Sequence, residues 1–490
     1  MTDSQTAAQR RWYALILLCF AQFIVVLDAS IVNVALPSIG TALDFSQENL
    51  SCVVNAYVLT FGGFLLLGGR MADLLGRRRV FMSGLVLFAL ASLAGGFAQT
   101  EGQLIVARAV QGLGAAILSP AALSIITTTF AEGAERTKAM GVWAAIAVGG
   151  GAVGLVLGGV LTTTLSWPWI FFVNVPVGIA VFVLSLRFVP ESKDEHAHKS
   201  FDVAGALTVT AGLLALVYGI VKAQEKGWTS LHTGGFFTLA VLLLVAFVVI
   251  ELRSAEPLVR LDIFRVRTVR AANVVMFLVA AGLFAMFYFN TLYLQRVLGY
   301  SALEAGLAFL PFTAGIIIGA GLSQKLVASL GAREVPLIGM PMAIVGLLLF
   351  MRLQPDSSYV TDLLPGIMLA SIGMGLVFVP ITLIATSGIP SDDAGLASGL
   401  FNTSQQVGGA LGLAILATLA VDATQNTLTD LGRQPSEADQ AQALVDGFHV
   451  AYLGSAALIG VAFFALLFLL RRQDVVAVGE GELATGSASA

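Results

Sequence analysis

Runs of about 20 apolar residues recur along almost all of this 490-residue sequence, and they constrain its fold more than any other feature. A helix of that length crosses the roughly 30 Å hydrocarbon core of a bilayer, since it rises about 1.5 Å per residue. Lipid offers no hydrogen-bond partners, so each run is expected to be a helix that satisfies its own backbone. Only 11% of the residues are charged, compared with about 25% in soluble domains. The sequence therefore predicts an all-α polytopic membrane protein.

Fourteen spans are expected. The first six lie near 12–37, 49–69, 80–98, 103–128, 139–163 and 169–189. Two more lie near 203–222 and 233–252, and the last six lie near 269–294, 302–323, 334–353, 362–386, 395–420 and 448–470. An even number of spans places both termini on the same side of the membrane.

The distribution of Lys and Arg decides which side that is. Twenty of the 26 basic residues fall on the face that carries both termini. The opposite face holds Lys222, Lys226, Arg296, Arg352 and Arg433, and Arg108 alone lies within a span. Because basic residues concentrate in cytoplasmic loops, both termini are predicted to be cytoplasmic, in a multi-pass protein of the cytoplasmic membrane.

Three patterns repeat at nearly constant offsets. The glycine-rich run 150–154 recurs at 408–412, Phe45-Ser46 recurs as Tyr300-Ser301, and Asn33 recurs as Asn290. Such agreement predicts two six-helix bundles in the same orientation, joined by an inserted pair of spans. The expected segments are 1–200, 201–252 and 253–480, followed by a disordered cytoplasmic tail at 481–490. Parallel six-span repeats that hold substrate at their interface are a transporter architecture.

A short charged loop joins the second and third spans. It contains Gly69, Asp73, Gly76, Arg77 and Arg78, and a degraded copy occurs about 255 positions later. The glycines permit tight turns and close packing. Asp73 can accept hydrogen bonds from the neighbouring guanidinium groups.

Together with this loop, three other runs resemble the major facilitator superfamily, and within it the fourteen-span drug:proton antiporter family. They are Leu27–Pro37, Arg108–Gly114, and the glycine-rich fifth span followed by Trp169–Pro176. The resemblance covers nearly the whole chain. It implies a major facilitator fold and the proton-coupled export, by alternating access, of small organic compounds such as drugs or antibiotics. The implied partners are that substrate, protons and the lipid bilayer, with no nucleic acid and with the chain acting as a monomer.

Asp28 is the expected carrier of the proton, and the resemblance implies a role in proton coupling for Arg108 as well. A carboxylate at mid-span costs about 2.5–3.5 kcal/mol, so it either pairs with a cation or keeps its proton. Arg108 cannot realistically lose its proton, and Asp28 is its obvious partner. The alternatives are a carboxylate that only holds helices together, and an arginine that reaches the interface from a helix end.

The resemblance implies that the charged loop is a gate. The carboxylate of Asp73 would hold the cytoplasmic side to the start of a helix of the opposite half, near Ser391-Asp392-Asp393. The alternative is a solvated basic loop that only fixes topology.

A smooth helix face is expected in the fifth span, where Gly150, Gly154 and Gly158 recur every four residues. The resemblance implies that this face seals the external half against a helix of the other repeat. Leu155 stands where the family usually has proline, so the family's kink is not assured here.

Other polar and aromatic groups are candidates to line a substrate cavity, or to bond between helices. They are Gln22, Asn33, Asn55, Tyr57, Gln111, Asn290, Tyr288, Asn402 and Gln405. Ser301 and Glu304 are expected to form a capping box at the start of the tenth span, rather than a second coupling site.

Three readings of function follow. Export is favoured. The alternatives are a metabolite or sugar importer or uniporter, and a transport-inactive membrane sensor or scaffold. The sequence shows no nucleophile–base arrangement and no phosphate loop, so an enzyme is not expected. No cofactor or metal is predicted.

Overall fold

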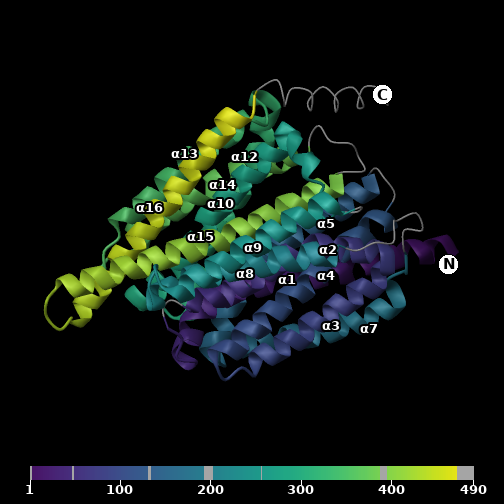
Figure 1. Cartoon of the computed structure of the whole chain (residues 1–490). Helices are drawn as coiled ribbons and strands as arrows, with labels where there is room; N and C mark the ends of the chain where they lie inside the picture. The colour runs from purple at the N-terminus through teal and green to yellow at the C-terminus, as the bar shows by residue number, and fades with distance from the viewer. Residues whose placement is uncertain are drawn as a thin grey trace. The chain divides into compact units, whose positions relative to one another are not determined.

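The structure, a computed structural model, describes residues 3–46, 49–130, 134–192, 202–254, 257–386 and 394–471. These residues form helices and no strand (Figure 1). In the first part of the chain the helices are α1 (Asp3–Ala42), α2 (Leu50–Leu75), α3 (Arg77–Gly96), α4 (Glu101–Thr129), α5 (Ala134–Thr164), α6 (Trp169–Phe172), α7 (Asn174–Phe188), α8 (Val203–Lys226) and α9 (Leu231–Arg253). They are followed by η1 (Leu261–Arg265), α10 (Arg267–Leu292), η2 (Tyr293–Val297), α11 (Ala302–Ala308), α12 (Leu310–Leu330), α13 (Glu334–Leu349), η3 (Phe350–Arg352), η4 (Tyr359–Leu363), α14 (Leu364–Ala385), α15 (Ala394–Asp430) and α16 (Glu437–Leu469).

The predicted spans all coincide with helices. Thirteen helical segments among the described residues are long and apolar enough to cross a membrane. Helix α5 adds a fourteenth, with 31 residues and a described apolar part at Gly149–Thr164. The predicted all-α polytopic fold is confirmed.

Several predicted helix ends were wrong. Helix α1 continues past Pro37 to Ala42, and α15 runs to Asp430 although apolar residues end near 420. Helix α16 begins at Glu437 and not near 448, because a capping box between Ser436 and Asp439 starts it in polar sequence. Hydropathy marks only the part of a helix that suits lipid, so it misses polar extensions.

Two predicted spans are interrupted. The sixth breaks at Val173 between α6 and α7, and the tenth breaks at Phe309 between α11 and α12. Pro311 lies in the first turn of α12, where its missing N–H costs nothing. The first break places Asn174 at the start of a helix in the interior of the protein.

The chain divides into two compact units. The first comprises Met1–Gly219, Leu231–Leu258 and Tyr300–Ala308. It thus includes α1 to α7, α9, α11 and most of α8. In this unit α2 and α3 pack on α4, and α1 packs on α5. The predicted segment boundaries at 200 and 253 stay a prediction, and the predicted tail at 481–490 lies outside the described residues.

The second unit comprises Ile220–Ser230, Val259–Gly299 and Phe309–Ala490. In it α10 packs on α15 and α16, and α14 packs on α12 and α13. Gly408 and Gly412 of α15 press against the backbone of Phe277 and Ala281 in α10. In the first unit Gly150 and Gly154 of α5 meet the backbone of Phe23 and Leu27 in α1 in the same way. The repeated glycine pattern therefore makes the same helix contact in each unit.

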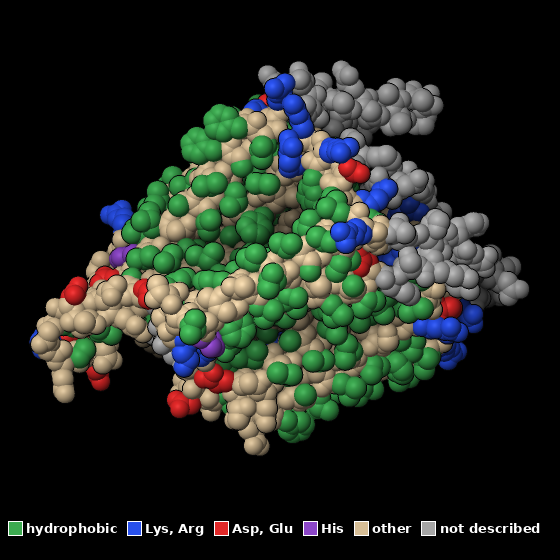
Figure 2. All heavy atoms as spheres, in the orientation of Figure 1, with side chains coloured by type: hydrophobic (Ala, Val, Ile, Leu, Met, Phe, Trp, Pro, Cys, Tyr) green, Lys and Arg blue, Asp and Glu red, His purple; other side chains and the backbone are tan. Residues whose placement is uncertain are grey.

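Large hydrophobic side chains are exposed along the outer faces of the helices. On the visible face in Figure 2 hydrophobic side chains cover the helix flanks, and most charged side chains lie toward the helix ends. Helix α9, for example, exposes Leu239, Val241, Leu242 and Val245. Continuous apolar exposure of this kind suits contact with lipid.

Candidate functional site

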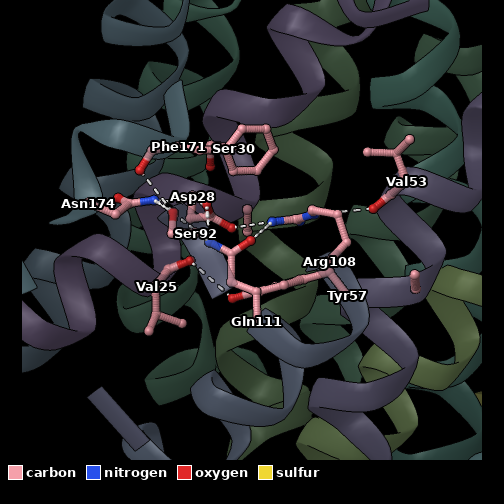
Figure 3. Close-up of polar contacts among 12 residues, drawn as sticks. Val25, Asp28, Ser30, Val53, Tyr57, Ser92, Arg108, Gln111, Phe171 and Asn174 are labelled. Atoms are coloured by element: carbon pink, nitrogen blue, oxygen red, sulfur yellow. Dashed lines mark hydrogen bonds and ion pairs between the residues drawn. The ribbon is translucent and has the colours of Figure 1, made fainter. Parts of the chain in front are cut away.

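A buried polar cluster in the first unit brings together residues from α1, α2, α3, α4 and α7 (Figure 3). Its centre is Asp28 of α1, which is fully buried, and Arg108 of α4, which is 1% exposed. Nη1 of Arg108 lies 2.5 Å from Oδ2 of Asp28. The pairing expected from the sequence is confirmed, and Arg108 does not reach the interface.

Helix α4 positions two of the groups. Its first turn is capped by the side chain of Thr100, which accepts from the backbone N–H of Gln103. Arg108 and Gln111 are three residues apart, so they share one face of the helix. Nη1 of Arg108 donates to Oε1 of Gln111 at 2.7 Å, and Nε2 of Gln111 donates to Oδ1 of Asp28 at 2.7 Å. The three side chains therefore form a closed ring of hydrogen bonds.

Helix α2 completes the surroundings of the guanidinium group. Gly112 of α4 has no side chain to hold α2 away, and its Cα faces the backbone carbonyl of Tyr57. The Tyr57 ring consequently lies 4.2 Å below Cζ of Arg108, in a cation–π contact. Nε of Arg108 donates to the carbonyl of Val53 at 3.2 Å. The cation is thus held by groups other than Asp28 as well.

Helices α3 and α7 add two neutral groups. Nδ2 of Asn174 lies 3.0 Å from Oδ1 of Asp28 and 3.0 Å from Oγ of Ser92. Ser92 Oγ donates to the carbonyl of Phe171 at 2.9 Å. Asn174 is the first residue of α7, which begins directly after the break at Val173. The cluster as a whole is neutral: one anion, one cation, and amide and hydroxyl groups.

The sequence did not single out Asn174 or Ser92 as site residues. Both are uncharged residues within apolar runs, and such residues often only bond between helices. The presence of one carboxylate and one guanidinium within spans identified the pair. Asn174 lies in the run Trp169–Pro176 that carries the family resemblance, but neither it nor Ser92 was predicted to take part in the site.

The charged loop contains a turn with a backbone conformation that favours glycine. Gly76, between α2 and α3, has φ of 105°, and its counterpart Gly331 has φ of 100°. Arg78 donates from Nη1 to the carbonyl of Val189 at the end of α7, at 3.3 Å. Arg333, the counterpart of Arg78, donates from Nε to the carbonyl of Leu470 at the end of α16, at 2.8 Å. The predicted copy of the loop thus caps the last helix in its own part of the chain.

Glu191 is a further partner of this loop that the sequence did not predict. Its Oε1 accepts from the backbone N–H of Arg78 at 3.1 Å, and its Oε2 lies 3.6 Å from Nε of Arg79. Arg77 donates from Nε to Oγ of Ser124 at 2.7 Å. The side chain of Asp73 and the predicted partners at 391–393 lie outside the described residues, so the gate stays a prediction, as does the part of Gly69 in it.

The nearest neighbours of the glycine face of α5 lie in α1. Gly154 would place a Cβ 2.8 Å from the carbonyl of Leu27, and Gly158 would place one 2.8 Å from the Ile31 side chain. Both neighbours belong to α1 of the same bundle, and a seal by Gly150, Gly154 and Gly158 against a helix of the other repeat, such as the tenth span, stays a prediction. The contact with that span uses the adjacent face: Gly159 meets Leu303, and the carbonyl of Leu155 meets Gly306 of α11. The four-residue period gave the packing face correctly, but it could not give the partner.

The predicted cavity residues fall into three groups. Tyr57 and Gln111 belong to the buried cluster. Asn55, Asn290 and Tyr288 are also buried, and Asn290 accepts from the hydroxyl of Tyr452 at 2.7 Å. The remaining four retain exposure: Gln22, Asn33, Asn402 and Gln405. Whether any of the nine lines a substrate cavity stays a prediction.

The capping box at the start of α11 is confirmed. The backbone N–H and the hydroxyl of Ser301 donate to Oε2 of Glu304, at 2.8 and 2.9 Å, and the Glu304 N–H donates to Oγ of Ser301 at 3.2 Å. The described residues contain no group of three or more His, Cys, Asp or Glu side chains that could hold a metal ion.

Fold and site together define a multi-pass α-helical membrane protein with a charge pair buried in its interior. The chain belongs to the Major Facilitator Superfamily, whose family model matches residues 18–413. The predicted superfamily fold is therefore confirmed.

Two named relatives resemble the chain over most of their length. The chain is 42% identical over 445 residues to the puromycin resistance protein pur8 of Streptomyces alboniger, covering 90% of this chain and 88% of the relative. It is also 42% identical over 428 residues to the cephamycin export protein CmcT of Amycolatopsis lactamdurans, covering 87% and 88%.

Solved structures support the fold. A bacterial homolog of the human lysosomal transporter Spinster, crystallised in an inward-facing and unoccupied conformation, matches with a TM-score of 0.67 and 15% identity. The match covers 96% of this chain and 98% of that one. At this identity the likeness concerns the fold alone.

Proposed function

We propose that this protein exports small organic compounds, antibiotics among them, across the cytoplasmic membrane in exchange for protons. Membership of the superfamily supports transport, and relatives named for puromycin resistance and cephamycin export support this direction and this class of substrate. The observation that carries the coupling is the ion pair of Asp28 and Arg108, buried in the first unit.

The pair has two states that differ by one charge. With Asp28 ionised, its carboxylate is held by Arg108, Gln111 and Asn174. Protonation removes the negative charge and with it the attraction to Arg108, which keeps its contacts with Val53, Gln111 and Tyr57. If only one of these two states permits a change of helix packing, proton uptake from outside is coupled to the movement that returns the empty substrate site to the cytoplasmic side. A membrane potential of 100 mV supplies about 2.3 kcal/mol per charge, roughly a fifty-fold gradient, so one proton is a useful driver.

Four other expectations take their place in this proposal. The loop around Gly76 acts as a cytoplasmic gate, and the contact between α5 and α11 closes the external side. Both termini are cytoplasmic, and the protein works as a monomer.

Inside-out vesicles test the proposal. Respiration acidifies their lumen and quenches a pH-sensitive dye, and an exporter then exchanges added compound for luminal protons. Addition of puromycin or of the fluorescent cation ethidium is expected to restore dye fluorescence in vesicles with the wild-type protein. The response is expected to vanish in Asp28→Asn and to persist in Glu304→Gln, which removes the charge of another span carboxylate, one that belongs to a capping box.

Two results would refute parts of the proposal. Wild-type vesicles that respond like vector-only vesicles to both compounds would contradict export of this substrate class. A normal response in Asp28→Asn would leave export intact and show that another group carries the proton.

A further inference from the structure

The carboxylate of Asp28 is surrounded by donors. Nη1 of Arg108 donates to Oδ2, whereas Nε2 of Gln111 and Nδ2 of Asn174 both donate to Oδ1 (Figure 3). An ionised carboxylate accepts only, so this shell suits it. A protonated carboxyl also has an O–H to donate, and a buried donor without an acceptor is destabilising. The protonated state therefore requires an acceptor that these three contacts do not provide.

Acceptor atoms near Asp28 differ in whether they are occupied. Oε1 of Gln111 already receives Nη1 of Arg108. Oγ of Ser92 receives both Gln111 and Asn174 while donating to the carbonyl of Phe171. Oδ1 of Asn174 is buried and has no hydrogen-bond partner among the described residues. Among these three side chains, Asn174 is thus the one whose amide oxygen has no hydrogen-bond partner among the described residues.

We propose that Asn174 is a positioning residue that holds the protonated form of Asp28 by reversing its side-chain amide. This rests on the proposed function, in which Asp28 takes up a proton from the aqueous phase. The proton forms an O–H bond at Oδ1 of Asp28, and the ion pair with Arg108 is the interaction that is lost. A half-turn about the last side-chain torsion of Asn174 exchanges its Nδ2 and Oδ1, so the carbonyl accepts from the new O–H.

The exchange requires a rotation of the Asn174 side-chain amide. Nδ2 lies 3.0 Å from both Asp28 Oδ1 and Ser92 Oγ, and the reversed amide places an oxygen at the same point. The Ser92 hydroxyl, which now donates to the Phe171 carbonyl, turns to donate to that oxygen. Both contacts keep their length and reverse their polarity.

Among the described residues, Arg108 and Tyr57 are the charged or titratable groups seen beside Asp28. Arg108 comes from α4, and Tyr57 comes from α2 with its hydroxyl donating to the carbonyl of Val25 at 3.4 Å. The charged groups of the other packed helices have contacts elsewhere: Glu304 with Ser301 at the start of α11, Arg187 with Phe188 near the end of α7, and Arg78 with Glu191 at the start of α3. The polarity of the Asn174 amide can therefore follow the charge of Asp28.

Infrared spectroscopy of the purified full-length protein in detergent tests the proposal. The C=O stretching band of a protonated carboxyl moves to higher frequency when its O–H loses an acceptor. The Asp28 band is identified at acidic pH as the one that is absent from Asp28→Asn. It is expected to shift upward in Asn174→Leu, and also in the smaller Asn174→Ser, which serves if the leucine variant does not fold.

Gln111→Leu is the matched control. It removes another amide donor from Asp28, but an amide whose oxygen is already occupied, so its Asp28 band is expected to stay at the wild-type position. A wild-type band in Asn174→Leu or Asn174→Ser, or an equal shift in Gln111→Leu, would overturn the proposal. The lack of any Asp28 band in the wild-type protein at acidic pH would instead overturn the coupling role on which it rests.

Discussion

Loss of Arg108 and loss of Asp28 are expected to destabilise the protein far less together than the sum of the two separate losses. In Arg108→Ala the carboxylate of Asp28 stays buried with only two amide donors, those of Gln111 and Asn174. Removing one member of a buried pair costs about 3–5 kcal/mol, because the remaining charge is not compensated. The substitution also removes the hydrogen bonds of Arg108 to Gln111 and Val53 and its cation–π contact with Tyr57. These losses place the variant toward the upper end of that range.

The double variant Asp28→Asn/Arg108→Ala removes the uncompensated charge. Its loss of stability is expected to be at least about 2 kcal/mol smaller than the sum of the two single losses, within the range seen for directly contacting residues. The measurement is unfolding by SDS in mixed detergent micelles, followed by circular dichroism, for the wild type, both single variants and the double variant.

Additive losses would refute this reasoning. So would an Arg108→Ala variant that unfolds within about 0.5 kcal/mol of the wild type, as an ordinary exposed substitution does. Either result would mean that the contact does not stabilise the folded protein as a charge pair.

Two glycine substitutions test the packing by the same unfolding measurement. Gly306→Ala presses a methyl group against the Leu155 carbonyl where α5 meets α11, so it is expected to cost about 1–3 kcal/mol of stability and to raise the passive proton leak of proteoliposomes. Gly321→Ala, with no neighbour within 4 Å, is expected to do neither. Equal behaviour of the two variants would contradict the close contact. Gly76→Ala adds a methyl group 2.8 Å from Oε1 of Glu191 at φ of 105°, and is expected to cost about 1–3 kcal/mol, more than Gly227→Ala, which has φ of 88° and no neighbour within 4 Å. If the two lose the same stability, contact with Glu191 contributes nothing.

Much of the fold could be predicted because lipid imposes a simple rule on sequence. A helix that crosses hydrocarbon must be apolar over about 20 residues, so the spans could be counted directly. Breaks within spans were not evident, since the residues around Val173 and Phe309 are as apolar as those of a continuous helix. The ends of α1, α15 and α16 were missed because helices continue into water, where hydropathy no longer identifies them.

The candidate site was predictable where charge was involved. A carboxylate and a guanidinium within apolar runs each need a partner, so Asp28 and Arg108 could be paired across 80 residues. Asn174 and Ser92 carry no charge, and their place depends on how α3 and α7 pack against α1. The partners of Gly158 and Gly159 likewise depend on tertiary packing, which the period along one helix does not contain.

The central claim is that Asp28 changes its protonation. Potentiometric titration of the purified wild-type protein and of Asp28→Asn, in the same detergent and from mildly acidic to mildly alkaline pH, counts the protons that each binds. We expect the wild type to bind one proton more per chain than the variant over this range. Superimposable titration curves would show that Asp28 keeps a single charge state, and would contradict the account.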